Sequence, residues 1–121
     1  SIQNTNLKIG LVTNTTRLTY QKIQKIINID DYFNYVLTVT EASKPKPSPE
    51  PYLQAMESLS LCANQTLIIE DSKTGLLSGI QSKANVIGIT TSLTKNQINN
   101  IDKNIIVANS YKEINQYFKY N

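Results

Sequence analysis

Five short apolar runs along the chain are typical of buried β-strands. They span residues 7–13, 35–40, 66–69, 86–90 and 105–108. A nearly continuous apolar run of this length indicates a strand that is covered on both faces, as in a parallel sheet. The pattern therefore predicts five short strands of that kind.

Apolar residues at helical spacing separate these runs. One apolar stripe is formed by Tyr20, Ile23, Ile26 and Ile27. Ser48 can cap a second helix with Pro49 at its first position, and further helices are expected after Ser72, over 94–102 and after Ser110. The residues expected to face the core in these later helices are Leu53, Met56, Leu59, Leu76, Leu77, Ile80, Ile114, Tyr117 and Phe118.

Local spacing supports two of these helix starts. Thr94 with Gln97 and Ser110 with Glu113 have the spacing of a capping box. Strands and helices then alternate with short connections, and parallel strands require such crossovers. The sequence predicts an α/β fold, a Rossmann-like parallel sheet flanked by helices, in a single domain over residues 1–121.

Composition narrows the possible partners. The net charge of +3 comes from lysines spread along the chain, with Arg17 the only arginine, so no basic stripe indicates nucleic-acid binding. No run approaches the roughly 18 apolar residues of a membrane span, and residues 1–6 do not resemble a signal peptide. Cys62 is alone and cannot form an internal disulfide. We expect a cytoplasmic protein without nucleic-acid or membrane partners.

The absence of histidine limits the possible chemistry. It excludes Ser-His-Asp and Cys-His hydrolysis and His-based zinc sites within this chain. Carboxylates, lysine and hydroxyl groups remain.

Polar residues follow three of the predicted strands directly. They lie at residues 13–16 (TNTT), 44–50 (KPKPSPE) and 70–72 (EDS). In a parallel α/β sheet, ligands bind beyond the carboxyl ends of the strands, so these segments are expected along one edge. Each segment alone is ordinary, but together they predict a phosphate pocket with a bridging Mg²⁺. Carboxylates suit the hard cation, and hydroxyl, amide and ammonium groups suit phosphoryl oxygens.

The segments VTNT, KPSPEPY and IIEDSKTG, in this order and spacing, resemble motifs two, three and four of the haloacid dehalogenase superfamily. The similarity runs over residues 7–90 and is nearest to phosphoglycolate phosphatases and β-phosphoglucomutases. It implies a phosphatase or phosphomutase that acts on small phosphorylated metabolites, such as sugar phosphates or phosphoglycolate, through an aspartyl-phosphate intermediate.

The resemblance also implies roles for individual residues. Thr13 would bind the phosphoryl group, with contacts from Asn14 and Thr15. Lys46 matches the lysine of motif three, with Lys44 as the alternate, because each precedes a Pro-x-Pro sequence. The two motif-four acids, Glu70 and Asp71, would bind Mg²⁺ directly or through water.

One part of the family pattern is missing. The family's nucleophile lies on an Asp-x-Asp segment at the end of a first, central strand, and none of the nine acidic residues forms such a segment. The chain therefore resembles an incomplete core, without the first strand and the helical cap domain. We expect it to be inactive alone, to need the missing N-terminal segment, and to expose two strand edges or close them up.

Three other interpretations are possible. A response-regulator receiver domain has its acids before its Thr and Lys, which is the reverse of the order here. A nicotinamide-binding domain lacks support because no Gly-rich turn follows the first strand. The third is a truncated or degenerate non-catalytic relative that binds phosphate or a partner chain.

Overall fold

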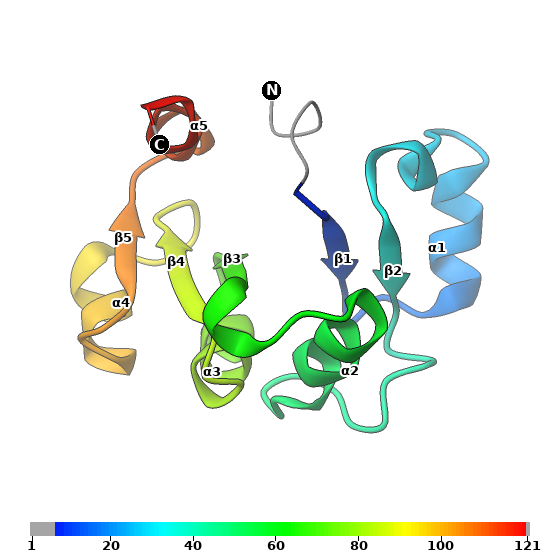
Figure 1. Ribbon diagram of the computed structural model, residues 1–121, viewed down its shortest axis with the longest axis horizontal. Helices are drawn as coiled ribbons and strands as arrows, with labels where there is room; N and C mark the ends of the chain where they lie inside the picture. Colours follow the sequence, from blue (N-terminus) through cyan, green and yellow to red (C-terminus); the bar gives the residue numbers. More distant parts are fainter. Residues whose placement is uncertain (1–6, 121) are drawn as a thin grey trace.

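Strands and helices alternate along the computed structural model, which describes residues 7–120 and, of their side chains, those up to residue 116 (Figure 1). The strands are β1 (Gly10–Val12), β2 (Tyr35–Leu37), β3 (Leu67–Glu70), β4 (Asn85–Ile89) and β5 (Ile106–Ala108). The α-helices are α1 (Arg17–Gln24), α2 (Glu50–Leu59), α3 (Lys73–Gln81), α4 (Lys95–Ile101) and α5 (Tyr111–Tyr120), and the 3₁₀ helices are η2 (Ile29–Tyr32) and η3 (Ala63–Gln65).

All strand pairs are parallel, which confirms the predicted α/β fold. The strands form two sheets, β1-β2 and β3-β4-β5, and Figure 1 shows β1 and β3 as the strands that face each other across the gap. Gly10 pairs with Tyr35 in the first sheet, and Glu70 pairs with Gly88 in the second. Within the described residues, β1 and β3 each pair with a strand on one side only, as expected of two strand edges.

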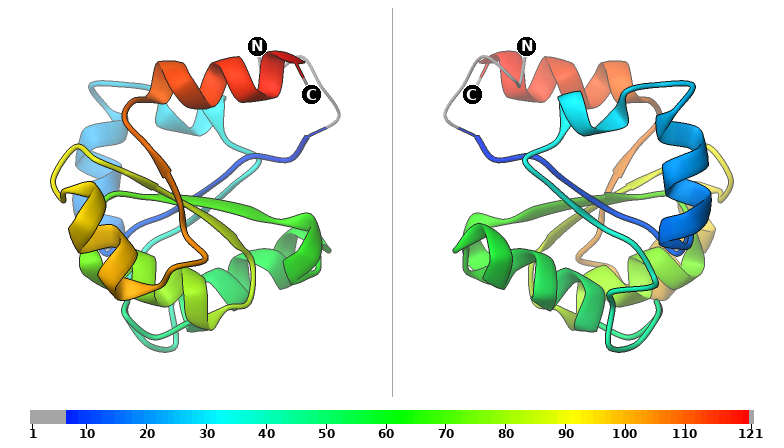
Figure 2. Two further views of the ribbon diagram at one scale, coloured as in Figure 1. Left: turned by 90° about the vertical axis from the view of Figure 1, so that its left-hand side faces the viewer. Right: turned by 90° about the vertical axis from the view of Figure 1, so that its right-hand side faces the viewer.

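Two helices join the sheets on one side. α2 contacts β1 and β2, α3 contacts β3 and β4, and the two helices contact each other. Figure 2 shows α2 and α3 on one side of the strands and α5 on the other. The relative position of the two sheets is therefore set largely by the packing of α2 against α3.

The main core lies between these helices and the larger sheet. Its buried members are Tyr52, Met56, Ile68, Leu76, Val86, Ile98 and Ile105. A smaller cluster of Ile87, Ile89, Ala108 and Ile114 lies beneath α5. Among the described residues, no helix is both long and apolar enough to cross a bilayer.

The predicted stripe of the first helix is wrong. Tyr20 is buried, but Ile26 and Ile27 are 85% and 57% exposed because α1 ends at Gln24. The chain reverses there: the Tyr20 hydroxyl donates to Asp30, and the Asp30 N–H donates to the Gln24 side chain. These two polar contacts replace the last helical turn that the apolar spacing predicted.

The second helix begins one residue later than predicted. Its N-cap is Pro49, and the Ser48 hydroxyl accepts a hydrogen bond from the Glu50 N–H at 3.2 Å. Met56 is buried as expected, whereas Leu53 is 40% exposed. Tyr52 takes the buried position in place of Leu53, because the apolar face of α2 is rotated by one residue.

The other helix starts agree better with the sequence. Ser72 caps α3, and Thr94 forms a complete capping box with Gln97. The Ser110 hydroxyl accepts from the Glu113 N–H, as in a capping box. The Glu113 carboxylate accepts from the N–H of Asn109 instead of that of Ser110, so the box is incomplete. Leu76 is fully buried, Leu59, Leu77 and Ile80 are half-buried, and Ile114 is buried. The side chains of Tyr117 and Phe118 lie outside the described part.

Candidate functional site

Lys46 joins the carboxyl ends of two strands that belong to different sheets. Its Nζ donates to the Val12 carbonyl at the end of β1, 2.9 Å away, and to Oε2 of Glu70 at the end of β3, 2.5 Å away. The side chains of Lys46 and Glu70 are only 9% and 10% exposed. The structure thus brings together two segments that the sequence placed at one edge.

The proline-rich loop that carries Lys46 is held against α3. The buried Ser78 hydroxyl donates to the Ser48 carbonyl at 2.6 Å, and the Gln81 amide donates to the Pro47 carbonyl at 3.1 Å. The Lys46–Pro47 peptide bond is cis. Lys44, two residues earlier, is exposed on the same loop. Of the two lysines considered from the sequence, Lys46 is the one placed between the strand ends.

The turn after β1 brings the Thr13 hydroxyl and the Asn14 amide side chain to the same edge. The Thr13 N–H donates to the Leu37 carbonyl of β2, and the Thr13 hydroxyl accepts from the Thr15 N–H at 3.1 Å. The exposed Asn14 accepts from the Lys46 N–H at 3.4 Å. A threonine hydroxyl that accepts one bond still has its own hydrogen to donate. Thr13 can therefore donate to a phosphoryl oxygen at this edge.

Glu70 is enclosed by the protein on several sides. Its Oε2 accepts hydrogen bonds from Lys46 and from the Tyr52 hydroxyl. The carboxylate also lies against Gly75 in the first turn of α3, where a Cβ atom would overlap with it. Burial, and then the negative charge of Glu70, raises the pKa of Tyr52, so that the hydroxyl remains a donor.

Asp71 is less enclosed than its neighbour. It is half-buried, and its Oδ2 accepts from the Thr91 hydroxyl at 3.0 Å. Glu70 and Asp71 offer the oxygen ligands that Mg²⁺ prefers, but the described residues contain no cluster of three candidate metal ligands. Two carboxylates are fewer than the six or more oxygen ligands that such a cation takes.

Sequence reasoning missed three residues at this site. The motif KPSPEPY contains Tyr52 and the motif IIEDSKTG contains Gly75, but neither motif implies a role for these residues. Thr91 lies outside all three motifs. These residues contact acids that lie 18, 5 and 20 positions away. For Tyr52 and Thr91, no local spacing pattern could indicate such contacts.

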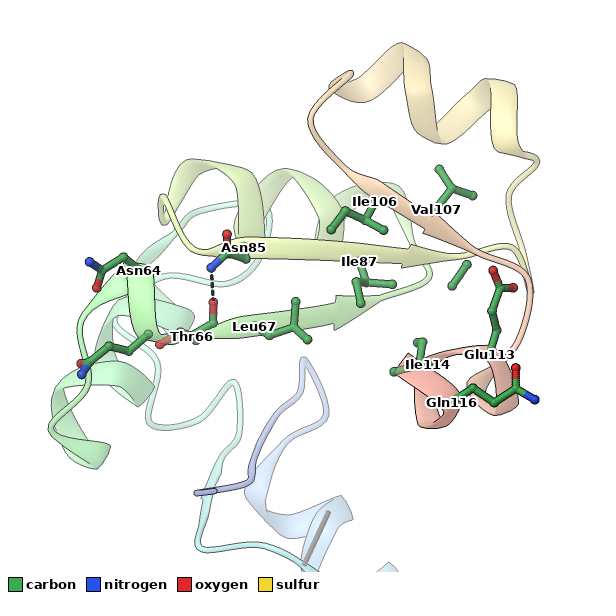
Figure 3. A pocket seen from close by; sticks show the side chains of 12 residues that line it. Asn64, Thr66, Leu67, Asn85, Ile87, Ile106, Val107, Glu113, Ile114 and Gln116 are labelled. Atoms are coloured by element: carbon green, nitrogen blue, oxygen red, sulfur yellow. Dashed lines mark hydrogen bonds between the residues drawn. The ribbon is translucent and has the colours of Figure 1, made fainter. Parts of the chain in front are cut away.

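Another pocket lies away from this edge. It has a volume of about 710 Å³ and lies along the larger sheet beside α5, where Figure 3 shows the apolar side chains of Leu67, Ile87 and Ile106. Among its described lining residues, Glu113 is the only charged one, and it already accepts a hydrogen bond from a backbone N–H. The described lining therefore offers no cation for a phosphate group.

A second pocket of about 530 Å³ leads to the site itself. It lies between β1 and β3 and is lined by the residues of both strands, and its lining includes Lys46, Tyr52, Glu70 and Asp71. The candidate site therefore occupies the end of a groove between two strand edges.

Known proteins include sequences similar to this chain. The sequence model of the haloacid dehalogenase-like hydrolases matches residues 1–89. Pyrophosphatase PpaX of Bacillus mycoides is 29% identical over 86 residues, which are 71% of this chain and 40% of that protein. PpaX of Oceanobacillus iheyensis is 27% identical over 92 residues, 76% of this chain and 43% of that protein.

Solved structures agree in fold. A candidate β-phosphoglucomutase from Thermotoga maritima has a TM-score of 0.85 at 21% identity, covering 98% of this chain and 55% of that one. CbbY from Rhodobacter sphaeroides, in complex with xylulose-1,5-bisphosphate, has a TM-score of 0.78 at 16% identity, covering 93% and 50%. The chain spans less than half the length of the PpaX proteins. The match over residues 1–89 shows that the chain belongs to the haloacid dehalogenase-like hydrolase family.

Proposed function

We propose that this chain is the phosphate-binding and metal-binding part of a Mg²⁺-dependent phosphohydrolase. One observation carries the proposal: Lys46 contacts the ends of both β1 and β3, so that Thr13, Glu70 and Asp71 share one edge with it. A hydroxyl donor, an ammonium group and two carboxylates at one place suit a phosphoryl group with a divalent cation.

Each residue has a separate role in this proposal. Thr13 and Lys46 donate to phosphoryl oxygens, with Asn14 and Thr15 near them. Asp71 accepts a hydrogen bond from Thr91, whereas Oε2 of Glu70 accepts two, so Asp71 is the acid proposed to bind the cation more directly. Mg²⁺, when bound, would neutralise part of the phosphoryl charge. The described side chains provide binding and charge stabilisation, but no free carboxylate pair that could act as nucleophile and acid–base.

The groove between β1 and β3 supports a place for the attacking group. Both strands are parallel members of their own sheets, and each has one edge toward the groove. A further parallel strand in the groove could pair with both edges, which would otherwise remain open. Its carboxyl end would then lie beside Lys46. An aspartate at that end is placed to form the aspartyl-phosphate intermediate of the proposed reaction.

Small phosphorylated metabolites are the proposed substrates. Curated relatives of the chain are named pyrophosphatases, and a protein of similar fold holds a sugar bisphosphate. Pyrophosphate, phosphoglycolate and sugar phosphates are therefore the compounds to test. We also propose a cytoplasmic location, which agrees with an exposed and unpaired Cys62.

The test compares the 121-residue chain with the complete gene product. Phosphate release is measured with Mg²⁺ and with EDTA over the three substrate classes. We expect activity only in the complete product and only with Mg²⁺. Lys46→Met and Asp71→Asn should each lower the rate of phosphate release about 10²-fold or more, which is the scale of a lost charge-stabilising group.

Two outcomes would contradict the proposal. No phosphate release from the complete product would favour a non-catalytic phosphate-binding or partner-binding protein. Phosphate release by the 121-residue chain alone, lost in Asp71→Asn, would show that no further segment is needed. Lys44→Met is the matched control for Lys46→Met, because Lys44 lies exposed on the same loop and should have little effect.

A further inference from the structure

Tyr52 is a buried tyrosine whose hydroxyl points at a charged group. The residue is 9% exposed on α2, and its hydroxyl donates to Oε2 of Glu70. The same oxygen accepts from Lys46. The Lys46 Nζ also lies 5.2 Å from the centre of the Tyr52 ring, within range of a cation–π contact. Tyr52 therefore contacts both members of the ion pair.

Glu70 cannot move freely away from these partners. Tyr52 and Lys46 donate to Oε2, and Gly75 lies against the same carboxylate, nearest to Oε1, where even a methyl group would collide with it. A poorly exposed ion pair is favourable only when its geometry is good and its remaining lone pairs are hydrogen-bonded. The Tyr52 hydroxyl supplies such a bond, and Gly75 provides the space for it.

We propose that Tyr52 is a positioning residue: it fixes the Glu70 carboxylate, which in turn holds the Lys46 ammonium at the ends of β1 and β3. Its geometric part is the positioning of Glu70 and Lys46 by Tyr52, which does not depend on what the protein binds. Its consequence for catalysis rests on the proposed function, in which Lys46 binds phosphate.

The chain contains a matched control for this contact. Tyr20 is 3% exposed, and its hydroxyl also donates to a carboxylate, that of Asp30. This pair lies at the end of α1 and contacts neither Lys46 nor Glu70. Tyr20→Phe and Tyr52→Phe each remove one tyrosine hydroxyl and its hydrogen bond to a carboxylate. Both substitutions should lower the stability of the fold, but only Tyr52→Phe should change the accessibility of the Lys46 ammonium group.

Lysine acylation of the 121-residue chain, followed peptide by peptide with mass spectrometry, tests the geometric part. In the chain without substitutions, Lys46 should be acylated more slowly than the exposed Lys44 on the same loop. Tyr52→Phe should raise the Lys46 rate about fivefold, as expected when one ordinary hydrogen bond is lost from a local opening equilibrium. Tyr20→Phe should leave the ratio of the two rates unchanged.

Gly75→Ala is a second variant: its Cβ atom would overlap with the Glu70 carboxylate and displace it, so this variant should also raise the Lys46 rate. It decides the question if circular dichroism shows that Tyr52→Phe does not fold. An unchanged Lys46 rate in the folded variant would overturn the inference. So would an equal rise in Tyr20→Phe, because the effect would then be general loosening.

Kinetics of the complete gene product test the catalytic consequence. Tyr52→Phe should lower kcat/KM about tenfold, less than the about 10²-fold that a 1 Å misplacement can cost. In a double-mutant cycle with Glu70→Gln, the two effects should be strongly non-additive, whereas Tyr20→Phe and Glu70→Gln should be additive. Additive effects of Tyr52→Phe and Glu70→Gln would overturn the positioning role. If the complete product has no activity, the proposed function fails, while acylation still decides the role of Tyr52.

Discussion

Replacing Lys46 by methionine tests how strongly the two halves of the chain are joined at the site. Methionine keeps most of the length and apolar character of the side chain but removes the ammonium group. The substitution breaks the 2.9 Å bond to the Val12 carbonyl and the 2.5 Å pair with Glu70. Glu70, which is only 10% exposed, would then retain the Tyr52 hydroxyl but no cation.

The size of the effect follows from this burial. Removing one partner of a buried ion pair costs about 3–5 kcal/mol, because a charge remains without compensation. The lower end applies here, about 3 kcal/mol, since Tyr52 still donates to the carboxylate. A chain of 121 residues has an unfolding entropy of about 0.25 kcal/mol per degree. Lys46→Met should therefore lower the Tm by about 12 °C.

Thermal unfolding followed by circular dichroism measures this change in the 121-residue chain. The double variant Lys46→Met with Glu70→Gln should recover part of the lost Tm, because no charge is then left unpaired. The coupling between the two sites should be at least about 1 kcal/mol. A fall in Tm of less than about 3 °C for Lys46→Met, or strict additivity of the pair, would refute the buried ion pair.

Three further predictions concern the rest of the fold. A hydrogen bond from Arg17 lowers the pKa of Glu41 to about 2 from 4.5, so its stabilisation is present above about pH 4.5 and is lost as the pH falls toward 2. Because the pair is about one-third exposed, Glu41→Gln should cost at most about 1 kcal/mol in urea unfolding at pH 7 and much less near pH 2, where about half of the carboxyl groups are protonated; an equal loss at both pH values would contradict this. Gly88→Ala would place a Cβ 3.0 Å from a core isoleucine and should destabilise the chain by about 1–3 kcal/mol in the same assay, whereas an unchanged midpoint would show that the core can adjust. Met56→Ala should cost about 2–4 kcal/mol and Leu53→Ser less than about 0.5, and equal costs would mean that the burial of α2 is wrong.

The sequence predicts the succession of strands along the chain and the sheet edge that carries the site, because both follow from local patterns. Apolar runs identify strands, and parallel strands place their carboxyl ends together. That reasoning brought Thr13, Lys46, Glu70 and Asp71 to one edge, and the structure places them there. Their roles in binding phosphate or metal stay predictions, because those depend on ligands rather than on the chain's own contacts.

The errors came from contacts between distant residues. The apolar spacing of Ile26 and Ile27 favours a longer helix, but the hydrogen bond between Tyr20 and Asp30 turns the chain first. The spacing in α2 allows either Leu53 or Tyr52 to face inward. Tyr52 is buried because its hydroxyl finds an acceptor in β3, which is remote in sequence. Such choices depend on tertiary partners, which a periodic pattern does not contain.

The same helix fixes both members of the central ion pair, and this explains how a loop lysine can be positioned so closely. α3 begins three residues after Glu70, the last residue of β3, and is anchored in the core by the fully buried Leu76. Two residues later, its buried Ser78 donates to the Ser48 carbonyl in the loop that carries Lys46. Packing of α3 therefore constrains the carboxylate and the ammonium group together. A strand that enters the groove between β1 and β3 would meet a site whose charged groups are already held by α3. A side chain at the end of that strand need then only reach these groups.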